Sequence, residues 1–220
     1  TADAAHELRS PLAALRLQVQ SLQRAGTDEA RAVARGRLLA GVDRATCLVE
    51  QLLALARHDA DTRVAAVAVD LAALARQAVL GGAAEAQARG IRLEEAGDAP
   101  VLVHGQPDAL AVLLRNLLDN ALRHTPEGGT VRVQAGQGAG GGAELAVEDS
   151  GPGIPPAERQ RVLDRFYRVP GAPGHGSGLG LAIAQAVARR HGAQLRVQDS
   201  PGLGGARLVV AWPAASHPPV

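Results

Sequence analysis

The chain has 220 residues, enough for one or two domains, and 46% of them are apolar. Only Phe166, Tyr167 and Trp212 are aromatic, so a core must be built from Leu, Val and Ala. The net charge of +1 means that overall electrostatics do not favour nucleic acid or an anionic membrane, and the single cysteine excludes an intrachain disulfide or a Cys-based zinc site.

Two long helices are predicted for residues 1 to about 60. Apolar residues recur in the first at alternating steps of three and four: Ala5, Leu8, Leu12, Leu15, Val19 and Leu22. Gly26 should end this helix, and Thr27, followed by acidic residues, gives a capped start to the next. A second seam follows through Leu38, Val42, Ala45, Val49, Leu52 and Ala56.

The apolar face of the second helix is wide, because further leucines lie beside the seam: Leu39, Leu48, Leu53 and Leu55. One hairpin of two helices cannot bury so wide a face on both members. The simplest solution is a homodimer that forms a four-helix bundle. The alternative is packing of this face against the rest of the same chain.

After a linker at residues 58–63, the pattern changes to mixed strands and helices over residues 64–213. Helices are predicted from Asp70, over Asp108–His124 and over Leu179–His191. Short strands are predicted at Ile91–Glu94, Val101–Val103, Thr130–Gln134, Glu144–Glu148, Leu195–Gln198 and Arg207–Trp212. This order favours an α+β sandwich with the helices on one face of a sheet. The tail, residues 214–220, is expected to be disordered.

The first helix contains the run HELRSPL, which starts at His6. His6 lies off the apolar seam, so it should face solvent, and Pro11 should kink the helix beside it. Neutral imidazole can attack phosphorus, and Glu7 could orient or deprotonate it. The alternative is an ordinary surface histidine. A zinc-protease HExxH motif is excluded, since Ser10 stands where the second His would be.

One polar stripe follows the helix predicted over Asp108–His124. Asn116 and Asn120 are four residues apart, and Arg123 and His124 continue their face. Amide oxygens suit Mg²⁺, a hard cation that also keeps water and phosphate ligands, and Arg123 could neutralise phosphate charge. A solvated helix face is the alternative.

Two glycine-rich segments follow. In DSGPGIP, Gly151 and Gly153 allow close approach of a flat ligand, and Asp149 can accept from the exocyclic amine of adenine, where guanine presents an acceptor. In GSGLGLAI, the glycines at positions 176, 178 and 180 open a helix whose free amides could bind phosphate. The second segment is neither a Rossmann fingerprint nor a P-loop. As a bare turn, DSGPG is common.

A glycine- and proline-rich stretch lies between these segments and has no apolar periodicity. It reads as a mobile lid over a nucleotide, from which Arg165 or Arg168 could reach phosphate.

Five segments, in this order, resemble the boxes of the catalytic core of bacterial two-component sensor histidine kinases: HELRSPL, LLRNLLDNALRHTP, EDSGPGIP, RFYR and GSGLGLAI. They are similar to the H, N, G1, F and G2 boxes of that family, and the resemblance covers nearly the whole chain. It implies a dimerisation and phosphoacceptor hairpin at residues 1–60. An ATP-binding domain of the Bergerat (GHKL) type would follow at residues 64–213.

The resemblance also implies the roles of single residues. His6 would be phosphorylated from ATP, with Glu7 as its acid/base neighbour. Asn120 would be the main Mg²⁺ ligand, supported by Asn116. Arg123 and His124 would line the phosphate side, and Asp149 would bind adenine. The ATP loops would be shaped by Gly151, Gly153, Gly176, Gly178 and Gly180. Arg168 is added as a nucleotide-site residue from its place beside the predicted lid.

The family's partner is a response regulator, which receives the phosphoryl group on an aspartate. Many members also dephosphorylate that partner with a Thr or Asn four residues after the histidine, where this chain has Ser10. The chain starts without Met inside a helical pattern, and it has neither a signal peptide nor an apolar run of ~20 residues. We therefore expect a cytoplasmic fragment of a bacterial inner-membrane protein, whose membrane segments lie upstream.

Two other functions fit parts of the pattern. A GHKL ATPase that uses ATP for conformational work would need no phosphoacceptor hairpin, so the hairpin with His6 argues against it. A non-catalytic dimerisation scaffold would not need intact residues such as Asn120, Asp149 and Gly178.

Overall fold

The structure of the chain is a computed structural model. It describes residues 15–24, 26–27, 30–31, 33–35, 38, 41, 66–97, 99–138, 140–169 and 178–214. The chain divides into two compact units, residues 1–62 and residues 63–220, which are considered separately below.

The first unit is helical wherever it is described between residues 15 and 24 and between 30 and 41. Thr27 caps the second helix, because its hydroxyl accepts from the amide of Ala30 at 3.2 Å and its carbonyl accepts from the amide of Arg31 at 3.0 Å. This confirms the turn predicted at Gly26 and Thr27. Large apolar side chains remain exposed in a single copy of this unit, among them Leu17, which is 66% exposed.

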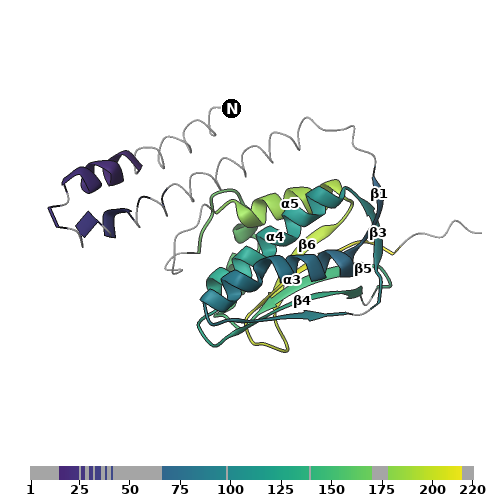
Figure 1. Ribbon diagram of the computed structural model, residues 1–220. Helices are drawn as coiled ribbons and strands as arrows, with labels where there is room; N and C mark the ends of the chain where they lie inside the picture. Colours follow the sequence, from purple (N-terminus) through teal and green to yellow (C-terminus); the bar gives the residue numbers. More distant parts are fainter. Residues whose placement is uncertain are drawn as a thin grey trace, which may run out of the picture. The chain divides into compact units, whose positions relative to one another are not determined.

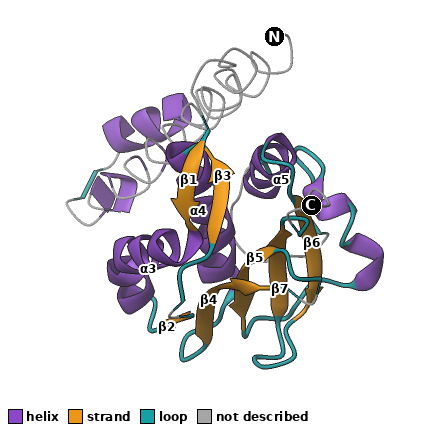
Figure 2. Ribbon diagram, turned by 90° about the vertical axis from the view of Figure 1, so that its right-hand side faces the viewer, coloured by secondary structure: helices purple, strands orange, loops and turns teal. Residues whose placement is uncertain are grey.

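The second unit is built on a five-stranded sheet with the strand order β2-β4-β5-β7-β6 (Figure 2). The strands are β2 (Arg92–Ala96), β4 (Thr130–Gln137), β5 (Ala143–Asp149), β6 (Gln194–Asp199) and β7 (Ala206–Ala211). β2 pairs with β4 in parallel, and the other neighbours are antiparallel. A separate two-stranded sheet pairs β1 (Val67–Asp70) with β3 (Leu102–Gly105).

Three helices cover one face of the five-stranded sheet (Figures 1 and 2). They are α3 (Leu71–Ala88), α4 (Pro107–His124) and α5 (Gly180–Arg190). This arrangement confirms the predicted sandwich. The core lies between the layers and is aliphatic, as the composition requires; its largest fully buried side chains include Leu110, Leu113, Leu114, Leu117, Leu145, Ile183 and Leu208.

Local chemistry explains where the helices begin and end. The Asp70 carboxylate accepts from the amide of Ala72 and caps α3, as predicted. Pro107 occupies the first turn of α4, where no amide hydrogen is needed, and Arg123 and His124 lie in the last turn, where the helix dipole favours positive charge. No helix in the described ranges is long and apolar enough to cross a membrane.

Three short elements were not predicted: β1 and the 3-10 turns η1 (Pro156–Glu158) and η2 (Arg161–Leu163). Each has only three or four residues, too few to show a periodic pattern.

Candidate functional site

Asp149 ends β5 and is 2% exposed. Its Oδ1 accepts two backbone hydrogen bonds, from Gly151 at 2.8 Å and from Ala206 at 3.1 Å. These two donors fix the orientation of the carboxylate. Within the described part of the chain, no group donates to Oδ2, which is therefore an acceptor available to a ligand.

The turn between β6 and β7 supplies part of this arrangement. Gly205 donates its amide to the carbonyl of Asp149 at 3.1 Å. A Cβ atom at Gly205 would lie 2.3 Å from that carbonyl oxygen and 2.4 Å from Oδ1, so the close approach requires glycine. Sequence reasoning missed Gly205 and Ala206, because the PGLGG segment signals only a turn and lies far from Asp149 in sequence.

Burial raises the pKa of Asp149, against the hydrogen bonds from Ala206 and Gly151 and the attraction of His124. His124, at the end of α4, has its pKa lowered by burial and by Arg123 and Arg168, while Asp149 opposes that shift. Since the ordinary pKa of histidine is already 6.5, a lowered value keeps this side chain neutral near pH 7. Arg123, Asp149 and Arg168 thus all lie close enough to His124 for their charges to shift its pKa.

The DSGPGIP loop packs against the end of α4. A Cβ atom at Gly151 would lie 2.6 Å from the carbonyl oxygen of His124, so the two backbones are in direct contact. The hydroxyl of Ser150 accepts from the amide of Thr130 at 2.8 Å and fastens the loop to the start of β4. The loop is therefore held between the end of α4 and the start of β4.

Asn116 faces the start of α5. Its Nδ2 donates to the carbonyl of Val112 at 2.8 Å, and since a carbonyl can only accept, the amide oxygen must point the other way. A Cβ atom at Gly180 would lie 3.2 Å from that Oδ1. Asn120 is half-buried one turn later on the same helix.

Amide oxygens such as these can bind Mg²⁺ when water and phosphate supply most of the ligands of the ion. Among the described residues, no group of three or more His, Cys, Asp or Glu side chains could hold a metal ion. A cation held through Asn116 and Asn120 would need most of its ligands from water and from phosphate oxygens. Mg²⁺ favours such a mixed shell, because it dehydrates reluctantly.

Phe166 and Gly178 close the base of the predicted lid. The amide of Phe166 donates to the carbonyl of Gly178 at 2.9 Å. Both residues have a positive φ, 64° at Phe166 and 68° at Gly178, and a Cβ atom at Gly178 would lie 2.6 Å from the Phe166 backbone. Beside this contact, the Tyr167 hydroxyl donates to Glu158, and the Arg161 guanidinium lies 4.3 Å from the centre of the Tyr167 ring.

The predicted site residues fall into two groups. His6, Glu7, Ser10 and Gly176 lie outside the described residues. The others all lie in the second unit: Asn116, Asn120, Arg123, His124, Asp149, Gly151, Gly153, Arg168, Gly178 and Gly180. Of these, Asp149 is hydrogen-bonded to Gly151, and His124 is influenced by the charges of Arg123, Asp149 and Arg168. Separately, Asn116 lies beside Gly180.

Two family models match the chain. The "Histidine kinase-, DNA gyrase B-, and HSP90-like ATPase" model matches residues 105–216, and the "His Kinase A (phospho-acceptor) domain" model matches residues 1–61. The sensor protein QseC of Salmonella typhimurium is 42% identical over 215 residues, which make up 96% of this chain and 46% of that protein. The chain thus spans about half the length of this relative.

Solved structures are also similar. The mycobacterial sensor histidine kinase MprB matches with a TM-score of 0.57 and 36% identity, over 67% of this chain and 97% of that chain. The Acinetobacter baumannii histidine kinase AdeS shares the fold, with a TM-score of 0.74 and 21% identity, over 96% of this chain and 98% of that chain. The chain belongs to the sensor histidine kinase family.

Proposed function

We propose that the chain transfers the γ-phosphoryl group of ATP to its own His6 and then to an aspartate of a partner response regulator. The observation that carries this proposal is the Asp149 carboxylate, which is buried, fixed through Oδ1 and able to accept through Oδ2. Such an acceptor suits the exocyclic amine of adenine. Membership of the sensor histidine kinases supplies the reaction class.

The two units would divide this work. Residues 1–60 would form the dimerisation and phosphoacceptor hairpin, in a homodimer, and residues 64–213 would bind ATP. The exposed apolar side chains of the first unit support a second copy as its partner. We further propose that the longer protein is anchored in the bacterial inner membrane by segments outside this chain.

Phosphoryl transfer depends on positioning and charge neutralisation. Asn120, supported by Asn116, would hold Mg²⁺, which supplies positive charge to the phosphates when bound. Arg123 and Arg168 would add to that charge, and neutral His124 would line the phosphate side. Gly151, Gly153, Gly176, Gly178 and Gly180 would let the backbone approach the nucleotide.

The covalent step would form one bond and break another. A lone pair of the His6 imidazole attacks the γ-phosphorus, and the bond from that phosphorus to the bridging oxygen of ADP breaks. Glu7 accepts the proton that the imidazole loses. The regulator's aspartate then attacks the phosphorus, the bond from phosphorus to the His6 nitrogen breaks, and Glu7 returns the proton, so that His6 regains its starting form.

The experiment is incubation of the chain with labelled ATP and Mg²⁺, followed by acid and alkali treatment. We expect label that is lost in acid and kept in alkali, as a phosphorus–nitrogen bond requires. The variant His6→Gln should retain no label. His104→Gln is the matched control, because His104 is exposed on β3, and it should label like the parent. Equal labelling of His6→Gln and the parent would exclude His6 as the acceptor.

A further inference from the structure

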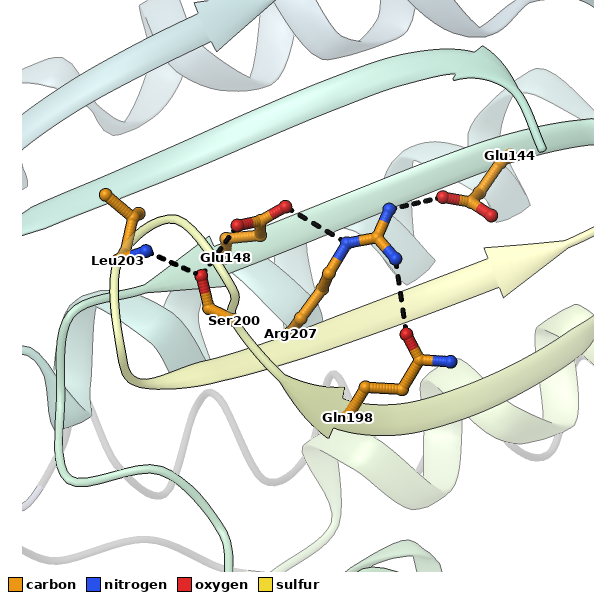
Figure 3. A network of polar contacts seen from close by, with 6 residues as sticks. All are labelled: Glu144, Glu148, Gln198, Ser200, Leu203 and Arg207. Atoms are coloured by element: carbon orange, nitrogen blue, oxygen red, sulfur yellow. Dashed lines mark hydrogen bonds and ion pairs between the residues drawn. The ribbon is translucent and has the colours of Figure 1, made fainter. Parts of the chain in front are cut away.

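A polar network lies on the sheet face that the helices leave uncovered (Figure 3). Its centre is Arg207 on β7, which contacts Glu144 and Glu148 on β5 and Gln198 on β6. Arg207 alternates along β7 with Leu208, which faces the core, so its own side chain emerges on the other face. The network ties three neighbouring strands together.

Glu148 and Ser200 are the buried members of the network. Glu148 is 6% exposed and accepts from Arg207 Nε at 3.0 Å and from the Ser200 hydroxyl at 2.7 Å. Ser200 is 4% exposed, and its hydroxyl oxygen accepts from the amide of Leu203 at 3.0 Å. Every member has a partner, which is the condition under which a buried polar network rigidifies its surroundings.

The same network fixes the turn that holds Asp149. The amide of Ser200 donates to the carbonyl of Gly205 at 2.8 Å, and the carbonyl of Ser200 accepts from Gly204 at 3.0 Å. Gly205 and Ala206 then donate to the carbonyl and to Oδ1 of Asp149. In the described part of the chain, two backbone donors to Asp149 therefore come from Gly205 in the turn and from Ala206 at the start of β7. The Ser200 backbone closes this turn, and its hydroxyl links the turn to Glu148 and to the amide of Leu203.

β5 connects the two sides of the sheet. Glu148 and Asp149 are consecutive, so their side chains point to opposite faces, Glu148 into the network and Asp149 into the candidate site. A second brace joins the DSGPGIP loop to the end of β6: Arg159 donates to the carbonyl of Ile154 and pairs with Asp199. Asp199 is 74% exposed, so this pair is the weaker constraint.

We propose that Ser200, Glu148 and Arg207 are positioning residues that set the discrimination between adenine and guanine nucleotides. They touch no nucleotide, and they act through the β6–β7 turn on the Asp149 carboxylate. This inference rests on the proposed function, in which Asp149 accepts from the adenine amine.

The test is Ser200→Ala in the full chain, with the dissociation constants for Mg·ATP and Mg·GTP measured by calorimetric titration. ATP affinity should fall by about three- to tenfold, because the carboxylate loses part of its alignment with the adenine amine, while GTP affinity stays the same. The matched control is Arg196→Ala. Arg196 is exposed on β6 and hydrogen-bonds only to Gln194 in the described part of the chain, so the ATP-to-GTP ratio should remain that of the parent.

Amide hydrogen exchange provides a second measurement on the same proteins. The amides of Gly205 and Ala206 should exchange faster in Ser200→Ala than in the parent, and Arg207→Gln should produce a smaller change in the same direction. A partial loss of folding weakens the apparent affinity for both nucleotides by the same factor, so it cannot mimic a change in the ratio of the two affinities.

The outcomes separate the two proposals. A parent that binds both nucleotides equally overturns the role of Asp149 in adenine recognition. The positioning role alone is overturned if the parent prefers ATP and Ser200→Ala has the same ATP-to-GTP affinity ratio and the same amide exchange rates as the parent. The positioning role is supported if Ser200→Ala has a lower ATP-to-GTP affinity ratio than the parent and its Gly205 and Ala206 amides exchange faster.

Discussion

The buried Asp149 carboxylate lowers the stability of the folded protein at neutral pH. Burial raises its pKa above the ordinary value of 3.8, so the folded state holds this proton to a higher pH than the unfolded state does. The unfolded state therefore binds fewer protons between these two pKa values, and stability falls as the pH rises through that window. Above the raised pKa the penalty is complete and constant.

The substitution Asp149→Asn tests both the effect of the buried carboxylate on stability and its proposed role in adenine binding. The neutral amide keeps an acceptor for Gly151 and Ala206, so the free energy of unfolding at pH 7 should rise, and the gain should shrink as the pH falls towards about 4. The amide nitrogen replaces Oδ2 and opposes the adenine amine, so ATP affinity should fall roughly 10- to 100-fold. Chemical denaturation over a pH series and ATP titration measure both effects.

Asp164→Asn is the control for this prediction, because Asp164 is exposed; its unfolding free energy should stay within about 0.5 kcal/mol of the parent. A less stable Asp149→Asn protein at pH 7 would mean that the ionised carboxylate is stabilised in the fold after all.

Single residues could be predicted from the sequence when their neighbours in sequence define them. Asp149 stands at the end of a strand pattern and before a glycine-rich turn, both of which are local signals. Its partners Gly205 and Ala206 could not be found in this way. They reach Asp149 only because β5 and β7 are neighbours in the sheet, and the sequence carries no local signal for strand order.

At the scale of elements, α4 was predicted almost to the residue, since its apolar face is regular and both ends carry suitable charges. β1 was missed, because its four residues gain their structure from pairing with β3. The parallel pairing of β2 with β4 also depends on contacts that are distant in sequence. Periodicity thus predicts an element, while its neighbours are decided by packing.

The start of α5 offers a test of backbone geometry. Gly178→Ala places a methyl group 2.6 Å from the Phe166 backbone at a φ of 68°, so the free energy of unfolding should fall by about 1–3 kcal/mol. ATP affinity should fall as well, because Gly178 is one of the proposed nucleotide-site residues and the backbone there would have to move. Thermal or chemical denaturation and ATP titration measure the two effects.

Gly81→Ala is the matched control for this substitution. Gly81 lies inside α3, and nothing lies within 4 Å of its added methyl group, so stability should rise by about 0.4–1 kcal/mol. If Gly178→Ala were equally harmless, the contact between Phe166 and Gly178 would not constrain the backbone before α5.

At the scale of the whole molecule, the composition and the change of pattern near residue 60 predicted a helical part followed by a sandwich of helices and strands. The structure confirms this class. The resemblance to the family depended on five motifs in a fixed order, each of them only moderately specific alone. The division into residues 1–60 and 64–213 remains a prediction about function, which separated fragments can test.

The last prediction concerns these fragments, residues 1–62 and 63–220, which correspond to the two compact units. Fragment 63–220 should bind Mg·ATP with the affinity of the intact chain, because all described candidate nucleotide residues lie within it. When the fragments are mixed, His6 should still gain label, but slowly. A tether gives an effective concentration on the order of 1 mM, so at about 10 µM the rate should fall roughly 100-fold.

The rate in the mixture should also increase in proportion to the concentration of fragment 63–220, since the encounter is now bimolecular. Fragment 63–220 carrying Asp149→Asn is the control and should give little label under the same conditions. A mixture that labels as fast as the intact chain, at every concentration, would contradict the proposal that the covalent link delivers the ATP-binding part to His6.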